Sequence, residues 1–413
     1  MPHYQTLALP SPLHMLGAAR QRGRLIILTA IIVVIVTPVV LVTAFFAVEV
    51  MAGLRPLRVA RAGGFVPRTA IVVPAHNEEG VIAETVRALI EAAPGALVLV
   101  VADNCTDGTA ALAREGGAQV LVRDDPDRRG KGFALAAARE WLRSDPPDVV
   151  LIIDADCWAD RASIDALARS ASASGRPCQA AYLLEPDLNV SPTLQISNFA
   201  FLIKNLVRQR GLQRLGGRAH LTGTGMAMPW SIFATADLGG SNIVEDLALG
   251  LELAGRNLPP MLREDAKVWS KAASDADTLT QRQRWEGGYL ATALHVAPRA
   301  LIRSVRRGDF RGLWAAMDLC VPPLALLVML NAFALFVTAV AIALGASSWP
   351  LLAQVAVGLL ALIVLAMAWA REGRAFVSAG SLFRLPLYIL WKVPLYLGLA
   401  RRGAPKDWVR TGR

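Results

Sequence analysis

The sequence is poor in cysteine, histidine and charge. It has four cysteines and five histidines in 413 residues, and charged residues make up only 18%. No two cysteines have Cys-x-x-Cys spacing, and the histidines have no spacing typical of metal ligands. We therefore expect four free thiols and no histidine-rich metal centre. The cysteines are Cys105, Cys157, Cys178 and Cys320.

The few charges are unevenly distributed along the chain. Residues 1–68 carry a net charge of +6 and residues 281–413 carry +11, whereas residues 69–280 carry −7. The basic ends adjoin long apolar runs, while the central part is acidic. A nucleic-acid-binding domain would carry its positive charge on the folded domain itself, so this distribution argues against one.

The N-terminal apolar run predicts a membrane anchor. Leu25–Val48 contains no charged residue and would form a helix of about 36 Å, enough to cross a hydrocarbon core of about 30 Å. The run is longer than the apolar region of a signal peptide, and no small-residue cleavage site follows it. We predict a tail over 1–24 and a transmembrane helix over 25–54. Arginines flank both ends of this helix, so its direction stays open.

Two further uncharged runs near the C-terminus predict a transmembrane hairpin over 319–369, with a short turn at 345–348. Arginines precede it in a basic linker over 299–318 and also follow it, which predicts that both feet face the cytoplasm. The stretch 375–400 is apolar but contains Arg384 and Lys392, so we interpret it as an interfacial amphipathic helix before a basic tail over 401–413. The predicted protein is a multi-pass component of the inner membrane.

The central residues, 65–298, form a domain large enough to bury its own core. Short apolar strands alternate with helices, which predicts a mainly parallel, doubly wound α/β sheet. In such a sheet, ligands bind beyond the carboxyl ends of the strands. The predicted strands cover 70–73, 97–102, 120–122 and 149–153, and the helices between them include 79–92 and 131–142.

Asp154 and Asp156 give the sharpest chemical signal. Residues i and i+2 of an extended strand point to the same side, so both carboxylates face one crevice. Carboxylate oxygens suit Mg²⁺ or Mn²⁺, with phosphate and water completing the coordination. An Asp-x-Asp triplet also occurs in solvated turns, but here it follows four apolar residues of a strand.

The order of seven motifs along about 220 residues is more specific than any one of them. The sequence resembles the membrane-bound family 2 glycosyltransferases with a GT-A fold, which include synthases of cellulose, chitin oligosaccharide, hyaluronan and poly-N-acetylglucosamine, and ceramide glucosyltransferases. The motifs are Val-Pro-Ala-His-Asn-Glu-Glu (73–79), Val-Ala-Asp-Asn-Cys-Thr-Asp-Gly-Thr (101–109), Arg-Gly-Lys-Gly (129–132), Asp-Ala-Asp (154–156), Gly-Thr-Gly-Met (223–226), Glu-Asp (245–246) and Gln-Arg-Gln-Arg-Trp (281–285).

The resemblance implies a Rossmann-like GT-A domain that binds a nucleotide sugar, with a UDP-hexose or UDP-N-acetylhexosamine as the expected donor. Ala75, Glu78 and Asp103 would hold the nucleoside, and Lys131 would approach the diphosphate. Asp154 and Asp156 would hold the Mg²⁺ or Mn²⁺ ion. A carboxylate can accept hydrogen bonds from nucleobase and ribose groups, so the first role is chemically sound. Glu78 at a helix start and Lys131 as a solvated lysine remain alternatives.

Asp246 is the predicted general base. Inverting sugar transfer needs a carboxylate that takes the proton of the acceptor hydroxyl and a cation that stabilises the departing nucleoside diphosphate. The Glu-Asp pair matches the Thr-Glu-Asp segment of the resembled family, with Val244 in place of the Thr. Capping of the following helix is the alternative role for this pair.

The last motif implies an acceptor-binding surface. Gln281 and Trp285 would contact the acceptor, and Arg284 would contact the diphosphate because its planar fork can donate two hydrogen bonds. Gly223 and Thr224 match a family loop near the donor sugar and the acceptor. Trp285 as an interfacial anchor and Gly223 as part of a plain turn stay open as alternatives.

The predicted function is inverting transfer of a sugar from a nucleotide sugar to a growing polysaccharide or oligosaccharide at the cytoplasmic side of the membrane. The alternative is a single transfer to a membrane lipid, and a lesser alternative is a non-catalytic scaffold. The few predicted membrane segments are meagre for an export channel, so an oligomer or an export partner would have to complete one. Membrane lipids and a saccharide or lipid acceptor are the expected partners.

Overall fold

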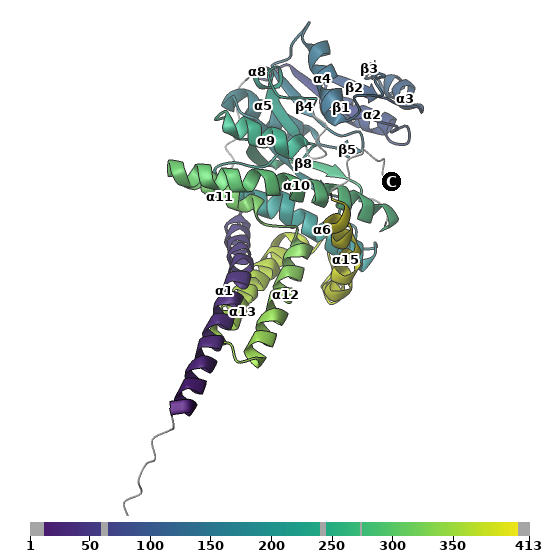
Figure 1. Cartoon of the computed structure of the whole chain (residues 1–413). Helices are drawn as coiled ribbons and strands as arrows, with labels where there is room; N and C mark the ends of the chain where they lie inside the picture. Colours follow the sequence, from purple (N-terminus) through teal and green to yellow (C-terminus); the bar gives the residue numbers. More distant parts are fainter. Residues whose placement is uncertain (1–11, 59–64, 240–244, 273–274, 404–413) are drawn as a thin grey trace, which may run out of the picture.

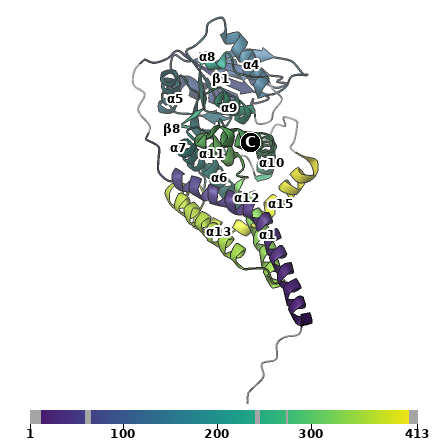
Figure 2. The same ribbon diagram turned by 60° about the vertical axis from the view of Figure 1, so that its left-hand side comes forward.

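The computed structural model describes residues 12–58, 65–239, 245–272 and 275–403. An α/β domain stands on a layer of helices, and three long helices extend away from that layer (Figures 1 and 2). The predicted tails, 1–24 and 401–413, lie largely outside the described residues or their described side chains. The fold therefore has a sheet domain, an intermediate helical layer and a bundle of apolar helices.

Among the residues that the structure describes, three helices are long and apolar enough to cross a membrane: residues 23–53, 324–343 and 349–373. They belong to α1 (Pro12–Gly53), α12 (Leu324–Ala343), and α13 (Trp349–Ala368) with its π-helical continuation η2 (Trp369–Gly373). The chain turns between α12 and α13 at the far end of the bundle (Figure 1). The first hairpin helix begins at Leu324 and not at 319, because Pro322 and Pro323 separate it from the preceding helix.

The sheet has eight strands in the order β3-β2-β1-β4-β7-β6-β8-β5. Strands β3, β2, β1 and β4 run parallel to one another, β7 runs antiparallel to both of its neighbours, and β8 is parallel to β6. The prediction of a mainly parallel α/β sheet is confirmed. The strands are β1 (Thr69–Ala75), β2 (Leu97–Asp103), β3 (Gln119–Arg123), β4 (Val149–Ile152), β5 (Cys157–Trp158), β6 (Cys178–Leu184), β7 (Met226–Pro229) and β8 (Met261–Ser270).

The parallel half is built as its sequence pattern predicts. The four predicted strands coincide with β1 to β4, each differing by a few residues at its ends. Strand β4 is buried on both faces, which is why its sequence is a continuous run of apolar residues. The helices that pack on this half are α2 (Ile82–Ala92), α3 (Thr109–Glu115), α4 (Lys131–Leu142) and α5 (Arg161–Ser174), with α8 (Trp230–Phe233) and α9 (Glu245–Gly255) later in the chain.

A layer of helices separates the sheet from the apolar bundle (Figures 1 and 2). Residues 299–318, the predicted basic linker, form the end of α10 and most of α11. Residues 375–400 divide into α14 and α15, and α15 does not meet the criteria for a membrane span among the described residues. The layer contains α6 (Pro192–Leu202), η1 (a π-helix, Ile203–Arg208), α7 (Gln209–Gly216), α10 (Asp275–Arg307), α11 (Phe310–Leu319), α14 (Ala379–Leu382) and α15 (Leu385–Arg402).

Buried ion pairs connect α1 to the helical layer. The Arg208 guanidinium contacts Glu49 on α1, with its Nε 2.8 Å from Oε2, and also contacts Asp318 on α11. Glycine permits the helices to approach closely here, because a Cβ at Gly211 would lie 2.2 Å from the Glu49 carbonyl oxygen. Loss of one partner would leave a buried charge uncompensated, so this contact fixes α1 against the domain.

Candidate active site

The carboxyl ends of β1, β2 and β3 place the predicted nucleoside-binding residues at one edge of the sheet. Ala75 ends β1 and Asp103 ends β2, and both are buried. The Asp103 carboxylate is fully buried, 2.5 Å from Arg123 Nη1, and it also accepts hydrogen bonds from Asn104 Nδ2 and the Gly130 amide. The Glu78 amide donates to Thr109 Oγ1 at 2.7 Å, which joins the first loop to the second.

Arg123 is a site residue that the sequence analysis missed. It ends β3 and lies directly beside Asp103 in the parallel register. Neighbouring parallel strands end at the same edge of a sheet, so an arginine at the end of the third predicted strand was the available signal. Its second guanidinium nitrogen pairs with Asp125 at 2.9 Å. Arg123 therefore neutralises Asp103 and fixes the loop that leads to Lys131.

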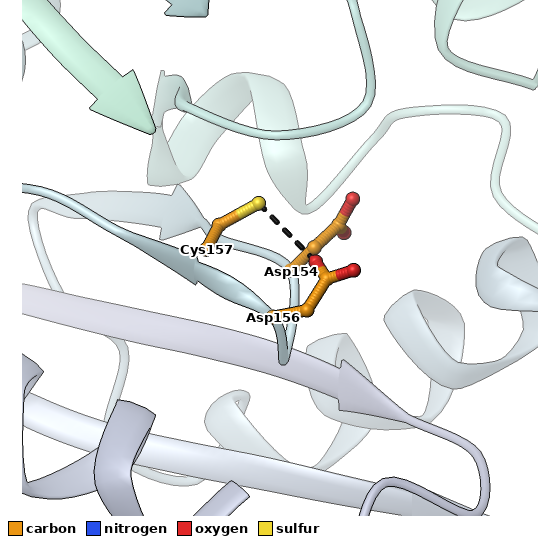
Figure 3. A group of neighbouring side chains, drawn as sticks. All are labelled: Asp154, Asp156 and Cys157. Carbon is orange, nitrogen blue, oxygen red and sulfur yellow. Dashed lines mark hydrogen bonds between the residues drawn. The ribbon is translucent and has the colours of Figure 1, made fainter. Parts of the chain in front are cut away.

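Asp154 and Asp156 follow β4, as the sequence predicts, and a thiol lies beside them (Figure 3). The ligand atoms of Asp154, Asp156 and Cys157 all lie within 4.8 Å of one another. The Cys157 thiol donates to Asp156 Oδ1 at 3.3 Å. Two carboxylates at this spacing fit Mg²⁺ or Mn²⁺, because these ions prefer oxygen ligands and leave coordination positions for phosphate and water.

Lys131 contacts one of these carboxylates. Its ammonium group forms an ion pair with Asp154 and donates to the Gly223 carbonyl oxygen at 2.8 Å. Burial opposes the charge, but Asp154 raises the pKa of Lys131 above its ordinary value, so the lysine stays protonated. A cation beside the metal ligands is well placed to meet a diphosphate, the role that the resemblance implies.

The Gly223-Thr224-Gly225 loop packs against Asp154, one of the predicted metal ligands. Thr224 is fully buried, and its hydroxyl accepts a hydrogen bond of 3.0 Å from the Asp154 amide. Gly223 has φ +88°, and a Cβ there would lie 3.3 Å from Asp246 Oδ2. Thr224 thus positions Asp154, and Gly223 lets the loop pass close to the predicted base.

Glu245 and Asp246 begin α9, which comes after the antiparallel strand β7 in the chain. Asp246 lies near Gly223, and Glu245 lies near the start of α4. Burial raises the pKa of Asp246 above its ordinary value, although the Leu247 amide, Lys131 and Lys204 oppose this shift. Burial also raises the pKa of Glu245 to about 7, and Glu245 accepts a hydrogen bond of 2.7 Å from the Gly132 amide. A raised pKa makes Asp246 a stronger base, which suits the removal of a proton from a hydroxyl group. Glu245 is a second residue that the sequence analysis did not assign to the site.

The last predicted motif lies on α10. Gln281 and Arg282 are buried, while Arg284 and Trp285 are half-buried. The Trp285 ring packs 5.7 Å from the Phe201 ring, and the Arg282 guanidinium lies over both rings, 4.9 Å from the Phe201 centroid and 5.2 Å from the Trp285 centroid. Arg282 and Phe201 were not predicted as site residues. The aromatic platform is assembled from α6 and α10, far apart in sequence.

All four cysteines are free thiols in the structure, as predicted.

Comparison with known proteins identifies this arrangement. A family model described as glycosyltransferase-like family 2 matches residues 67–288, more than half of the chain. The chain belongs to glycosyltransferase family 2. This confirms the prediction of a glycosyltransferase enzyme with a GT-A fold that uses a nucleotide sugar, and the Asp154, Asp156 and Cys157 group supplies ligands that fit the metal of such enzymes.

Two known proteins resemble the chain in different ways. The solved mannosyltransferase PcManGT from Pyrobaculum calidifontis, in complex with GDP-Man and Mn²⁺, matches with a TM-score of 0.51 and 18% identity, over 89% of this chain and 99% of that one. The low-salt glycan biosynthesis hexosyltransferase Agl6 from Haloferax volcanii is 40% identical over 97 residues, 23% of this chain. The matched segment spans 22% of the Agl6 length. The first likeness shows the fold.

Proposed function

We propose that this family 2 enzyme transfers a hexose from a nucleoside diphosphate sugar to a saccharide acceptor at a membrane, with inversion at the anomeric carbon. The observation that carries the proposal is the joint position of the metal ligands, Lys131 and Asp246 around the Gly223 loop. The two similar proteins are a mannosyltransferase and a hexosyltransferase, which supports a hexose as the transferred group.

Each group has a defined task in this mechanism. Asp154 and Asp156 would hold the divalent ion, which stabilises negative charge on the departing diphosphate when it is bound. Lys131 binds the same diphosphate as a cation, and Asp103 with Arg123 shapes the nucleoside pocket. Asp246 removes the proton of the acceptor hydroxyl as its oxygen attacks the anomeric carbon from the face opposite the diphosphate. Arg284 and Trp285 present the acceptor from α10.

The membrane part favours a second candidate acceptor. Only three helices among the described residues are long and apolar enough to cross a membrane. This number is small for a polysaccharide channel, so a single transfer to a lipid-linked acceptor is the alternative to chain extension. The proposed location is the inner membrane, with the sheet domain and Asp246 on the cytoplasmic side, where nucleotide sugars are made.

The proposal is tested by nucleotide release from the full chain in lipid nanodiscs. UDP-glucose, UDP-N-acetylglucosamine, UDP-galactose and GDP-mannose are each supplied with Mn²⁺ or Mg²⁺ and membrane acceptors. We expect release from one donor, lost on chelation with EDTA and in Asp156→Asn, but kept in the control Asp165→Asn on α5. Nuclear magnetic resonance of the product should show a β-linkage from an α-linked donor. Retention of configuration, or release insensitive to EDTA, would contradict the mechanism.

The same assay separates the two acceptor candidates. A ladder of products indicates chain extension, whereas addition of one sugar indicates a single transfer.

A further inference from the structure

Two cations on the acceptor side of the site have no carboxylate partner among the described residues. Lys204 lies on η1, and Arg282 lies on α10. No ion pair within 4.0 Å joins either of them to a described aspartate or glutamate, whereas the neighbouring Arg208 contacts both Glu49 and Asp318. The mechanism above uses neither cation.

Helical spacing places both cations along one contact between two helices. Ser197, Phe201 and Lys204 are four and three residues apart, so they share one face of α6 and η1. Arg282 contacts Ser197 and Phe201, and Lys204 contacts Tyr289, which lies two turns beyond Arg282 on α10. The two cations therefore lie along the same contact between facing helices, with the Tyr289 partner of Lys204 about 10 Å along α10 from Arg282.

Arg282 is a buried cation with little compensation. Only 6% of the residue is exposed, and its one hydrogen bond to a described residue runs from Nε to Ser197 Oγ at 3.2 Å. The acid one turn along the helix, Glu286, is engaged by Lys392 Nζ at 2.7 Å and by the Tyr396 hydroxyl at 2.6 Å. A buried guanidinium with unused donors is costly unless an anion contacts it.

Lys204 is the exposed member of the pair. Its ammonium group lies 5.4 Å from the centroid of the Tyr289 ring. The Tyr289 hydroxyl is held in place because its one hydrogen can be donated to any of three carbonyl oxygens, those of Asp318, Leu319 and Val321, which lie 3.2 to 3.3 Å away. The ring is thus a fixed support for the ammonium group of Lys204, a residue that is exposed in the structure.

Lys204 also lies within electrostatic range of the predicted base. Its charge interacts with that of Asp246, and the interaction with Arg282 is repulsive. Burial lowers the pKa of Arg282, which an anion bound beside it would reverse. Lys204 is therefore on the side of the site where the proposed base would act.

We propose that Lys204 and Arg282 form a subsite for a phosphate group carried by the acceptor. This inference rests on the proposed function and specifies its acceptor class. A guanidinium fork and an ammonium group together match the several oxygens of a phosphate, and the aromatic platform of Phe201 and Trp285 lies beside them for the sugar. The phosphate belongs either to a lipid-linked acceptor or to a water-soluble sugar phosphate.

The test measures phosphate binding with the donor site already filled. The full chain in nanodiscs is saturated with Mn²⁺ and the nucleoside diphosphate that the release assay selects. Inorganic phosphate, octyl phosphate and the neutral octyl glucoside are then titrated by calorimetry. Lys204→Met is compared with Lys204→Arg and with Lys267→Met, a matched control because the Lys267 ammonium lies 5.9 Å from the Trp269 ring on another surface.

We expect octyl phosphate to bind the wild-type protein and to bind Lys204→Met at least about tenfold more weakly, since a charge-assisted hydrogen bond is lost. Lys204→Arg and Lys267→Met should bind within about threefold of wild type. Tighter binding of octyl phosphate than of inorganic phosphate identifies a lipid-linked acceptor, and equal binding identifies a soluble one.

Three results would overturn the subsite: no binding of either phosphate, equal binding of octyl glucoside and octyl phosphate, or equal losses in Lys204→Met and Lys267→Met. If the nucleoside diphosphate itself fails to bind with Mn²⁺, the proposed function fails. If it binds and the phosphates do not, only the subsite fails.

Discussion

The proposed active site has a donor half and an acceptor half, which are built in different ways. The donor half consists of loops that directly follow parallel strands, so Asp103, Asp154 and Asp156 each come after a short apolar run. The acceptor half is assembled from β7, α9, η1 and α10, with side chains that meet across large sequence separations. We therefore expect the donor half to bind the nucleotide sugar, a ligand shared with other family members. We expect the acceptor half to determine the acceptor specificity of this enzyme.

Asp246→Asn should give the largest effect and separate the two halves most clearly. Removal of a general base lowers the rate by about 10²–10⁴-fold, whereas the amide keeps the size of the side chain. We expect the rate of transfer to fall by about 10³-fold, while the affinity for the nucleoside diphosphate with Mn²⁺ stays unchanged by calorimetry. A parallel loss of donor affinity would show that Asp246 belongs to the donor half.

Arg123→Met should mainly damage the donor half. It leaves the fully buried Asp103 carboxylate without its cation, and an unpaired buried charge costs about 3–5 kcal/mol. We expect the free energy of unfolding of the sheet domain to fall by about 3 kcal/mol in denaturant titrations, with weaker nucleotide binding. The control is Arg68→Met, which breaks the exposed Arg68–Asp145 pair and should leave stability unchanged. Equal effects of the two substitutions would argue against a buried structural role for Asp103.

Glu245→Gln should change the pH dependence of stability. In the folded protein burial raises the pKa of Glu245 to about 7, above its ordinary value of 4.5, so the folded state binds the proton more tightly. The native protein should therefore lose stability as the pH rises from 4.5 to 7. Glutamine cannot ionise and keeps an oxygen for the Gly132 amide. We expect the variant to be more stable than wild type by about 1 kcal/mol at pH 8, a value reduced for partial exposure, and equal to it near pH 4.5. Thermal unfolding at both pH values measures this, and equal stability at pH 8 would show that Glu245 titrates normally.

Cys157→Ser should give the smallest effect. The hydroxyl still donates to Asp156, and Mn²⁺ prefers oxygen ligands, so we expect Mn²⁺ affinity within about threefold of wild type by electron paramagnetic resonance. A loss above about tenfold would show that the thiolate is itself a metal ligand.

The sequence predicted the donor half in detail because its signals are local. A buried strand followed by a polar loop specifies both the fold and the place of Asp154, and the helix predicted over 131–142 coincides with α4. Arg123 shows where prediction from local signals fails. Its partner Asp103 is 20 residues away in the sequence, and only the parallel pairing of β2 with β3 brings the two side chains together.

The acceptor half was less predictable because packing decides it. The position of Lys204 over Tyr289 depends on how η1 meets α10, and nothing in the pattern around 204 signals that contact. The predicted membrane segments were only partly predictable from the sequence. Their apolar lengths were evident, but the role of residues 299–318 as helices of a packed layer, in place of a linker, follows from tertiary contacts such as those of Tyr289 with Asp318.

The ion pair between Glu286 and Lys392 has a mechanical consequence. Glu286 follows Trp285 directly, and Lys392 lies on α15 with no exposed surface. The pair joins α15 to the part of α10 that carries the aromatic platform of Phe201 and Trp285, so we expect a tilt of α15 to displace Trp285. The enzyme should therefore respond to the thickness and composition of its lipid surroundings through α15, and extraction into detergent should affect turnover before it affects nucleotide binding.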